Sequence, residues 1–167
     1  MLSPVQQQFR NAMSKLAAAV NIITTDGEAG KCGITATAVC SITDTPPTLM
    51  VCINQNSEMN AVFQQNKRLC VNILTSEQEE LACHFAGFKG SSMEERFAWD
   101  IWQPNEEQSA VPMLKEALAN LKGTIVDIRN VGTHSLFLVE LEHIAVAEEG
   151  QGLVYFNRHF HHIGSTP

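Results

Sequence analysis

Short segments of strand-forming residues recur along this chain, separated by turns or short helices. Antiparallel strands can be joined by tight turns, whereas parallel strands need crossover connections of about a dozen residues or more. The spacing therefore predicts antiparallel pairing. Strands are expected over residues 21–25, 31–39, 48–53, 68–74, 119–129, 135–147 and 153–157.

In the longest predicted strand, the alternation of apolar and polar residues shifts by one position part of the way along. Its apolar residues form two sets: Phe137, Val139 and Leu141, then Ile144 and Val146. Successive side chains of a strand alternate between its faces, so the two sets share a face only if one extra residue separates them. This predicts a β-bulge near Glu142 and His143, of the kind that barrels use to bend. The expected fold is mainly β with peripheral helices, arranged as a small, partly closed barrel.

Capping signals locate the helices. A capping box at residues 3–6 has Pro at the first helical position, and apolar residues then recur at helical spacing as far as about Ala19. Shorter helices are expected to begin at Ser57 and at Ser76, the second again with a capping box. Residues 87–112 show no clear period and are expected to form a long, partly ordered loop.

Composition excludes several classes of protein. The 167 residues suffice for one domain, residues 1–167, with a sizeable core. The net charge of −7 and the scattered 11 Lys and Arg residues argue against nucleic-acid binding. Apolar runs are too short for a membrane span, and the N-terminus does not resemble a secretion signal. The five cysteines are odd in number and form no C-x-x-C pair, so a reduced, cytoplasmic protein is expected.

Residues 33–41 combine small residues with hydroxyl side chains. Thr35, Thr37 and Ser41 are spaced by two and four residues, so on an extended chain they point to one side. Small residues such as Gly33 allow the backbone to approach a flat ligand closely. The segment fits a planar cofactor with polar edges, and it equally fits a threonine-rich edge strand.

Several short motifs stand in a specific order along the chain. They are V-N-I-I-T-T at residues 20–25, G-I-T-A-T-A-V-C-S at 33–41, T-P-P-T-L-M-V-C-I at 45–53, L-C-V-N-I-L at 69–74, H-F-A-G at 84–87, E-E-R-F at 94–97, G-T-H at 132–134 and Y-F at 155–156. Together they resemble the flavin reductase family of two-component monooxygenases, from about Phe9 to about Phe160. The resemblance implies a split-barrel flavin-binding fold, FAD or FMN as cofactor and NADH as co-substrate. It also implies a homodimer with flavin near the subunit interface, and a partner oxygenase, an aromatic hydroxylase, that receives diffusible reduced flavin.

The resemblance assigns flavin contacts to several segments. The flavin-binding residues so implied are Thr35, Ala36, Thr37, Ala38, Val39, Ser41, Cys52, Ile53, Asn54, Asn56, Ser57, His84, Phe85, Ala86, Lys89, Tyr155, His159 and Phe160. Hydroxyl and backbone N–H groups of residues 35–39 and 52–54 would bond the flavin edge. The helix start at Ser57, with Asn56, would face phosphate or ribityl oxygens, although Ser57 also fits an ordinary N-cap. Lys89 would neutralise the phosphate or is an exposed loop lysine.

Aromatic residues and one histidine complete the implied site. Tyr155 and Phe160 would offer flat surface to the nicotinamide or flavin rings. In the family, the histidine of a Gly-x-His motif lies at the nicotinamide site, and His134 matches it. Many members have Asp before this histidine, whereas this chain has Thr133. A positioning or polarising role for His134 is therefore expected without a His–Asp charge pair; the alternative is an ordinary surface histidine.

The remaining motifs say less about function. Residues 27–32 resemble a phosphate-binding loop, but their glycines are too close together, so a hairpin turn is expected. No G-x-G-x-x-G motif occurs, so NADH would bind without a Rossmann unit. The histidine-rich segment 158–162 lacks a nameable third ligand, so no metal is expected. Two other functions are open: a ferric or other electron-acceptor reductase on the same barrel, and a non-catalytic flavin- or haem-binding module.

Overall fold

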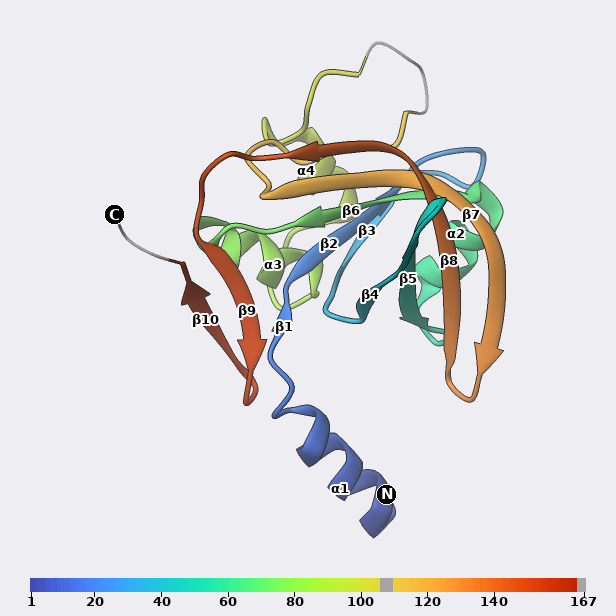
Figure 1. Cartoon of the computed structure of the whole chain (residues 1–167), viewed down its shortest axis with the longest axis vertical. Helices are drawn as coiled ribbons and strands as arrows, with labels where there is room; N and C mark the ends of the chain where they lie inside the picture. Colours follow the sequence, from blue (N-terminus) through green and yellow to red (C-terminus); the bar gives the residue numbers. More distant parts are fainter. Residues whose placement is uncertain (106–109, 165–167) are drawn as a thin grey trace.

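Antiparallel strands form the body of the molecule (Figure 1). The computed structural model describes residues 1–105 and 110–164. Seven strands form one sheet in the order β3-β2-β6-β7-β8-β5-β4, and three form a second sheet, β1-β9-β10. The strands are β1 (Ala18–Ala19), β2 (Asn21–Thr25), β3 (Cys32–Ala36), β4 (Val39–Asp44), β5 (Pro47–Asn54), β6 (Arg68–Ile73), β7 (Ala119–Val131), β8 (His134–Val146), β9 (Gly152–Phe156) and β10 (His159–Ile163). Their neighbours pair antiparallel, as predicted.

The two edge strands of the large sheet are consecutive in the chain. β3 ends at Ala36 and β4 begins at Val39, so Thr37 and Ala38 carry the chain from one edge to the other. Three residue steps span at most about 11 Å, so the two edges lie close together. The sheet is therefore a barrel split between β3 and β4.

The prediction of one strand over residues 31–39 was wrong. The N–H of Val39 donates to the carbonyl of Thr37 at 2.9 Å, and this tight turn ends the extended conformation. Ser41 consequently lies on the opposite edge strand from Thr35. The strand pattern continues through the turn in the sequence because neither residue in it is a glycine or proline.

The predicted bulge is confirmed. Lys122 pairs with His143 and Gly123 with Leu141, which leaves Glu142 as the extra residue of β8. A second register shift follows on β7, between residues 125 and 127. Bulges increase local twist and bend, so they curve the long β7–β8 hairpin around the barrel, as Figure 1 shows.

Two apolar clusters fill the molecule. The barrel interior holds Ile23, Leu49, Val51, Ile53, Phe63, Leu69, Val71, Phe137 and Val139, among others. Phe63 comes from α2 (Glu58–Asn66), and its ring centroid lies 6.4 Å from that of Phe137. The second cluster lies against α3 (Glu79–Phe85) and contains Val20, Ile22, Leu74, Phe85, Leu114 and Leu153.

A buried amide attaches the segment before β7 to the sheet. The Asn72 side chain donates to the carbonyl of Ile22 (2.8 Å) and the hydroxyl of Thr24 (3.1 Å). Its oxygen accepts from the N–H of Leu114 and the amide of Asn120, each at 2.9 Å. Asn72 is fully buried, and all its polar capacity is used. Such a network fixes where the segment lies.

The helices differ from the prediction in extent. The N-terminal helix α1 (Pro4–Met13) has the predicted capping box but ends six residues before Ala19, because residues 18–19 instead form β1 and pair with β9. The second capping box begins at Thr75, one residue earlier than predicted, and opens a 3₁₀ turn (Ser76–Gln78) before α3. The expected loop 87–112 contains α4 (Met93–Ala98), capped by Ser92.

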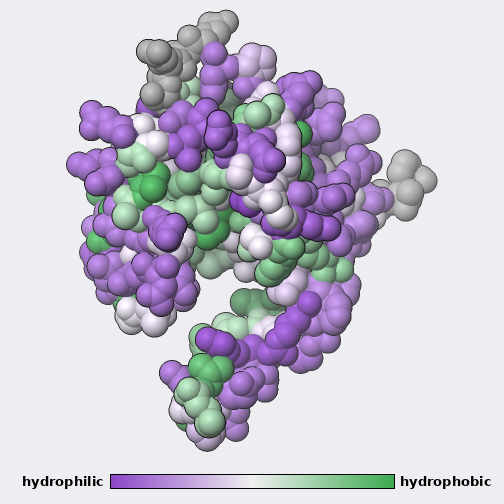
Figure 2. All heavy atoms as spheres, turned by 180° about the vertical axis from the view of Figure 1, so that it is seen from behind, coloured by the Kyte–Doolittle hydropathy of each residue, from purple (hydrophilic) through white to green (hydrophobic). Residues whose placement is uncertain are grey.

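Helix α1 projects from the body (Figure 1). None of its residues is buried, and Val5, Phe9 and Met13 expose much of their surface. Figure 2 shows apolar atoms along this projecting helix. Within the described part of the chain, no helix is both long and apolar enough to cross a membrane.

Candidate functional site

A cavity of about 570 Å³ opens between the end of β3 and the β9–β10 hairpin. It is lined by Val20, Thr35, Ala36, Thr37, Glu79, Phe88, Tyr155, Arg158, His159 and Phe160. Six of the predicted flavin-binding residues therefore meet here, although β3 and β10 are more than a hundred residues apart in the chain. The volume lies within the range of about 300–1,000 Å³ that is typical of small-molecule sites.

One wall of the cavity is aromatic. Tyr155 and Phe160 pair across β9 and β10, and their rings meet edge to face with centroids 5.2 Å apart. Phe88, which follows α3, is 76% exposed and contributes to the same lining. Exposed aromatic surface is costly in water, and a flat ring system would cover it favourably. This wall suits a planar ligand.

The end of β3 supplies hydroxyl groups to the same lining. Thr35 is half-buried, and its hydroxyl donates to the carbonyl of Ala82 at 2.7 Å. The Thr35 hydroxyl therefore offers a ligand only acceptor capacity. Thr37 is exposed in the turn between the edge strands and is free to donate or accept. The two threonines are thus not equivalent.

The sequence-based site prediction missed four residues of the cavity lining: Val20, Glu79, Phe88 and Arg158. Arg158 stands in the β9–β10 turn with a φ of +63°, and its side chain donates to Asn11 of α1 at 2.9 Å. It places a permanent positive charge beside His159. β10 was not predicted, because histidines dominate it, and the turn that precedes it was therefore not predicted either.

A second group of predicted residues lies where β5 meets α2. Ser57 caps α2 as predicted, and its hydroxyl accepts from the N–H of Met59 at 3.3 Å. The N–H of Asn56 donates to the side chain of Asn54 at 2.9 Å. Asn54 in turn pairs with His134 across β5 and β8. This corner therefore holds three predicted flavin residues and the predicted nicotinamide residue together.

His134 opens β8 after a two-residue turn. Val131 pairs with His134, and Gly132 adopts a φ of +55°, which glycine tolerates without strain. The His134 Nδ1 lies 2.9 Å from the Thr133 hydroxyl, which orients the ring and leaves Nε2 free for a ligand. Among the described residues, the cavity lining beside Thr35 does not include His134. Within a single chain, Thr35 and His134 therefore do not line the same described cavity.

Other predicted positions have limited access to a ligand. The side chains of Ile53 and Phe85 belong to the core, so only their backbone can face a flavin. The N–H of Cys52 donates to the carbonyl of Ala38 at 3.0 Å and is occupied within the chain. Ser41 lies exposed on β4, paired with Leu49.

The segment after α3 is held by a polar cluster. The His84 Nδ1 lies 2.7 Å from the hydroxyl of Ser91, which also accepts from the Arg96 Nε at 2.8 Å. The His84 ring meets Trp99 edge-on, with centroids 4.9 Å apart. Ala86 caps the helix, and Lys89 is exposed beyond it. His84 thus secures the segment that carries Phe88 and Lys89.

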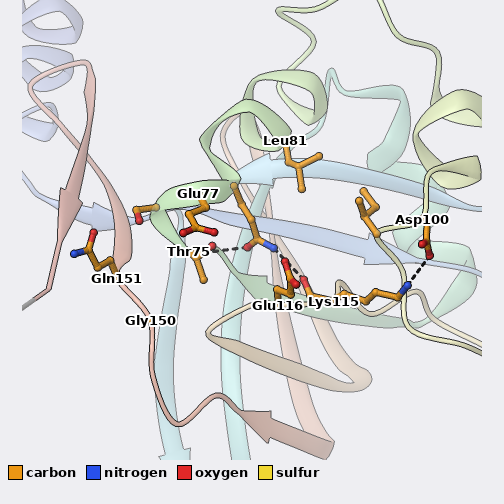
Figure 3. Close-up of a pocket in the computed structure, with 11 residues that line it drawn as sticks. Thr75, Glu77, Leu81, Asp100, Lys115, Glu116, Gly150 and Gln151 are labelled. Carbon is orange, nitrogen blue, oxygen red and sulfur yellow. Dashed lines mark hydrogen bonds and ion pairs between the residues drawn. The ribbon is translucent and has the colours of Figure 1, made fainter. Parts of the chain in front are cut away.

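A larger cavity of about 700 Å³ lies elsewhere (Figure 3). It is lined by Thr75, Ser76, Glu77, Gln78, Leu81, Asp100, Ile101, Lys115, Glu116, Gly150 and Gln151. Its one lysine is paired with Asp100 at 2.5 Å, and Gln78 donates to the Lys115 carbonyl at 2.9 Å. None of the predicted site residues lines it, so size alone does not identify the site.

The fold and the smaller cavity define a split-barrel protein that can hold a flat, polar-edged ligand. The chain matches the flavin reductase like domain over residues 13–164, and it belongs to this family. It is 60% identical to the 4-hydroxyphenylacetate 3-monooxygenase reductase component of Pseudomonas aeruginosa, across 97% of this chain and 94% of that protein. It is 46% identical to the FMN reductase (NADH) RutF of Enterobacter cloacae, across 96% of both chains.

A solved structure shows the same architecture. The flavin reductase PheA2 in its native state superposes with a TM-score of 0.84 at 30% identity, covering 98% of this chain and 100% of that one. The resemblance inferred from the motifs and the expected split-barrel fold are both confirmed.

Proposed function

We propose that this protein is an NADH-dependent flavin reductase that supplies free reduced flavin to a partner oxygenase. The observation that carries the proposal is the cavity that the hydroxyl segment of β3 and the aromatic β9–β10 hairpin line together. Its chemistry fits a flavin, because an isoalloxazine ring needs flat apolar contact on its faces and hydrogen bonds at its edge. The family membership supports the same conclusion.

The flavin supplies the redox chemistry, by accepting at N5 the hydride that leaves C4 of the nicotinamide. The chain has to bind and orient the two partners. Tyr155, Phe160 and Phe88 would contact the rings, and Thr37 would bond the polar edge. Arg158 would balance the negative charge of a phosphate or of the reduced ring. No nucleophilic side chain is required.

His134 acts on the nicotinamide in this proposal. The Thr133 hydroxyl holds its Nδ1, so Nε2 is the atom available to the nicotinamide carboxamide. Since Thr133 carries no charge, the effect of His134 is one of orientation rather than of a charge pair. In the dimer proposed below, the His134 corner of one copy and the cavity of the other would form one site.

The partner oxygenase is proposed to be 4-hydroxyphenylacetate 3-monooxygenase. The support is the 60% identity to a protein named as the reductase component of that enzyme. FAD and FMN both remain candidate flavins, since both present the same ring to the cavity. We further propose that the protein works in the cytoplasm as a single domain, consistent with its five free cysteines.

Anaerobic NADH oxidation with FMN, FAD or riboflavin tests the function. We expect rapid NADH oxidation with at least one free flavin. With 4-hydroxyphenylacetate 3-monooxygenase on the far side of a dialysis membrane, the reduced flavin should diffuse across and support hydroxylation once oxygen is admitted, without contact between the two proteins. Activity with a ferric chelate in flavin-depleted protein would favour the alternative reductase. Flavin or haem binding without NADH consumption would favour a non-catalytic module.

A homodimer is proposed from uncovered apolar surface. Val5 and Phe9 on α1 are 73% and 63% exposed, and Val146 on β8 is 73% exposed. An isolated helix as short as α1 is marginal in water, so packing of its apolar face must contribute to its stability. A symmetric second copy is the commonest way to cover such surface.

Sedimentation at micromolar concentration tests the dimer. The wild-type chain is expected to sediment as a dimer, and replacing Val5 and Phe9 with serine is expected to weaken it. Gln7→Ser, on the opposite face of the same helix, is the matched control. A fully active wild-type monomer would refute the dimer without affecting the reductase proposal.

A further inference from the structure

Gln55 joins the end of β5 to the tip of the β7–β8 hairpin. Its backbone N–H donates to the carbonyl of Thr133 at 2.9 Å. Its side-chain Nε2 donates to the carbonyls of Gly132 at 3.3 Å and His134 at 3.0 Å. One residue therefore engages three consecutive carbonyl groups of the turn that carries His134.

Gln55 attaches the hairpin tip to the end of β5, beyond the last pair of the ladder between β5 and β8. The ladder between β5 and β8 ends at the pair of Asn54 and His134, and the turn residues lie beyond it. Figure 1 shows the β7–β8 turn at the end of a long hairpin. Loop tips fray readily because few contacts hold them. Gln55 extends the attachment one residue past the last ladder pair.

The backbone at Gln55 is itself fixed. Its two neighbours in the chain are joined, because the N–H of Asn56 donates to the Asn54 side chain at 2.9 Å. The N–H of Ser57 donates to the Asn54 carbonyl at 3.1 Å. The buried side chain of Asn60 on α2 donates to the carbonyl of Ile53 at 3.2 Å. Gln55 thus links this hydrogen-bonded corner directly to the turn that carries His134.

We propose that Gln55 is a positioning residue for His134. The inference rests on the proposed roles of His134 at the nicotinamide and of Asn54, Asn56 and Ser57 at the flavin. Gln55 lies between the residues proposed to face the flavin's phosphate and ribityl oxygens and it bonds the turn that carries His134, so it fixes the position of His134, and of the nicotinamide it orients, relative to the bound flavin. Hydride transfer is sensitive to such spacing, since a misplacement of about 1 Å can lower a rate about 100-fold.

Gln55→Ala tests the proposal in the full-length protein. It removes the two side-chain bonds and keeps the backbone bond to Thr133. We expect kcat/KM for NADH to fall about 3- to 10-fold, with the flavin dissociation constant changed less than about twofold. Gln65→Ala, on the exposed surface of α2, is the matched control and should leave both values unchanged. Gln55→Glu should be worse than Gln55→Ala, because its carboxylate has no proton to donate and would repel the two carbonyl oxygens, of Gly132 and His134, that the Gln55 side chain bonds.

A double-mutant cycle separates positioning from general destabilisation. If Gln55 acts through His134, Gln55→Ala in a His134→Ala background should have no further effect on NADH kinetics. Additive losses, or parallel losses of flavin affinity and thermal stability, would overturn the positioning role. If His134→Ala alone leaves NADH kinetics unchanged, the proposed role of His134 fails and the positioning role fails with it. If His134→Ala is impaired but Gln55→Ala is not, only the positioning role fails.

Discussion

The hydroxyl of Thr35 donates a 2.7 Å hydrogen bond to the carbonyl oxygen of Ala82, which links the edge strand β3 to α3. The same carbonyl also accepts from the N–H of Ala86 at 2.9 Å, so it keeps a partner if the threonine is lost. Thr35 therefore has a structural role that the exposed Thr37 lacks. This difference allows the two predicted flavin contacts to be tested separately.

Thr35→Val should lower the free energy of unfolding by about 0.5–1.5 kcal/mol, the usual net value of one hydrogen bond. Thr37→Val should leave stability within about 0.5 kcal/mol. It should weaken flavin binding by about 1–3 kcal/mol if Thr37 bonds a desolvated flavin edge. Urea unfolding and flavin titration measure the two effects. Unchanged flavin affinity in a folded Thr37→Val variant would remove this residue from the site.

His134→Ala should affect NADH and hardly affect flavin. Loss of an orienting group is expected to raise the barrier by about 1–2 kcal/mol, or about 5- to 30-fold in rate. Steady-state kinetics with saturating flavin should show a higher KM for NADH, a lower kcat, or both, with flavin affinity within about twofold of wild type. Collapse of flavin binding with normal NADH kinetics would instead assign His134 to the flavin.

Gly123→Ala should be strongly destabilising. Gly123 is buried beside the β8 bulge, and a Cβ at this position would overlap the carbonyl oxygen of Glu140 and lie 2.8 Å from the Cα of Leu141. Both neighbours are backbone atoms, so the two strands must move apart. We expect a loss of about 3 kcal/mol or more, at the upper end of overpacking effects. Thermal melting measures the effect. Gly90→Ala, which has open space around its position, should lower the melting temperature far less than Gly123→Ala.

The cysteines should differ in reactivity towards iodoacetamide at pH 8. Burial raises the pKa of the Cys32 and Cys70 thiols to about 12, so both remain protonated and enclosed. Burial, and then the neighbouring Cys40 thiol, raise the pKa of Cys52. Cys40 is exposed and should be modified first. Peptide mass spectrometry of briefly treated native protein should find Cys40 labelled well ahead of Cys32, Cys52 and Cys70.

Because of the same two buried thiols, we expect the free energy of unfolding to fall at alkaline pH. In the unfolded chain the two thiols have their ordinary pKa of 9.0, whereas in the folded chain burial raises the pKa of each to about 12. The folded state then binds more protons, so its stability falls as pH rises from about 9 towards 12 and is unaffected by these groups below 9. Urea midpoints at pH 8 and pH 10 should show the decline. Cys70→Ala should make it shallower, and Cys40→Ala should not.

Local patterns predicted much of the architecture. The alternation of apolar residues placed the strands, and the slip between Leu141 and Ile144 placed the bulge at Glu142, because side-chain direction follows from position along an extended chain. Ser57 was recognisable as a helix cap because its hydroxyl serves the helix's own N–H groups. The order of short motifs indicated the family.

The candidate site was predicted less completely. Thr35, Thr37, Tyr155 and Phe160 were named from sequence and do meet in one cavity. Arg158 and Phe88 were missed because an arginine in a turn and an aromatic in a loop carry no periodic signal. The occupied N–H of Cys52 could not be foreseen, since its acceptor belongs to the turn that closes the barrel.

The sequence by itself determined the strands, their antiparallel pairing, the bulge and the family, because each depends on neighbouring residues or on motif order. Only the tertiary structure decided where β3 ends and β4 begins, which splits the barrel at Thr37 and Ala38. It alone brought the β9–β10 hairpin against β3 and tied Gln55 to the His134 turn. These features depend on sheet closure and on contacts between distant segments, and such contacts leave no periodic trace in the residues that make them.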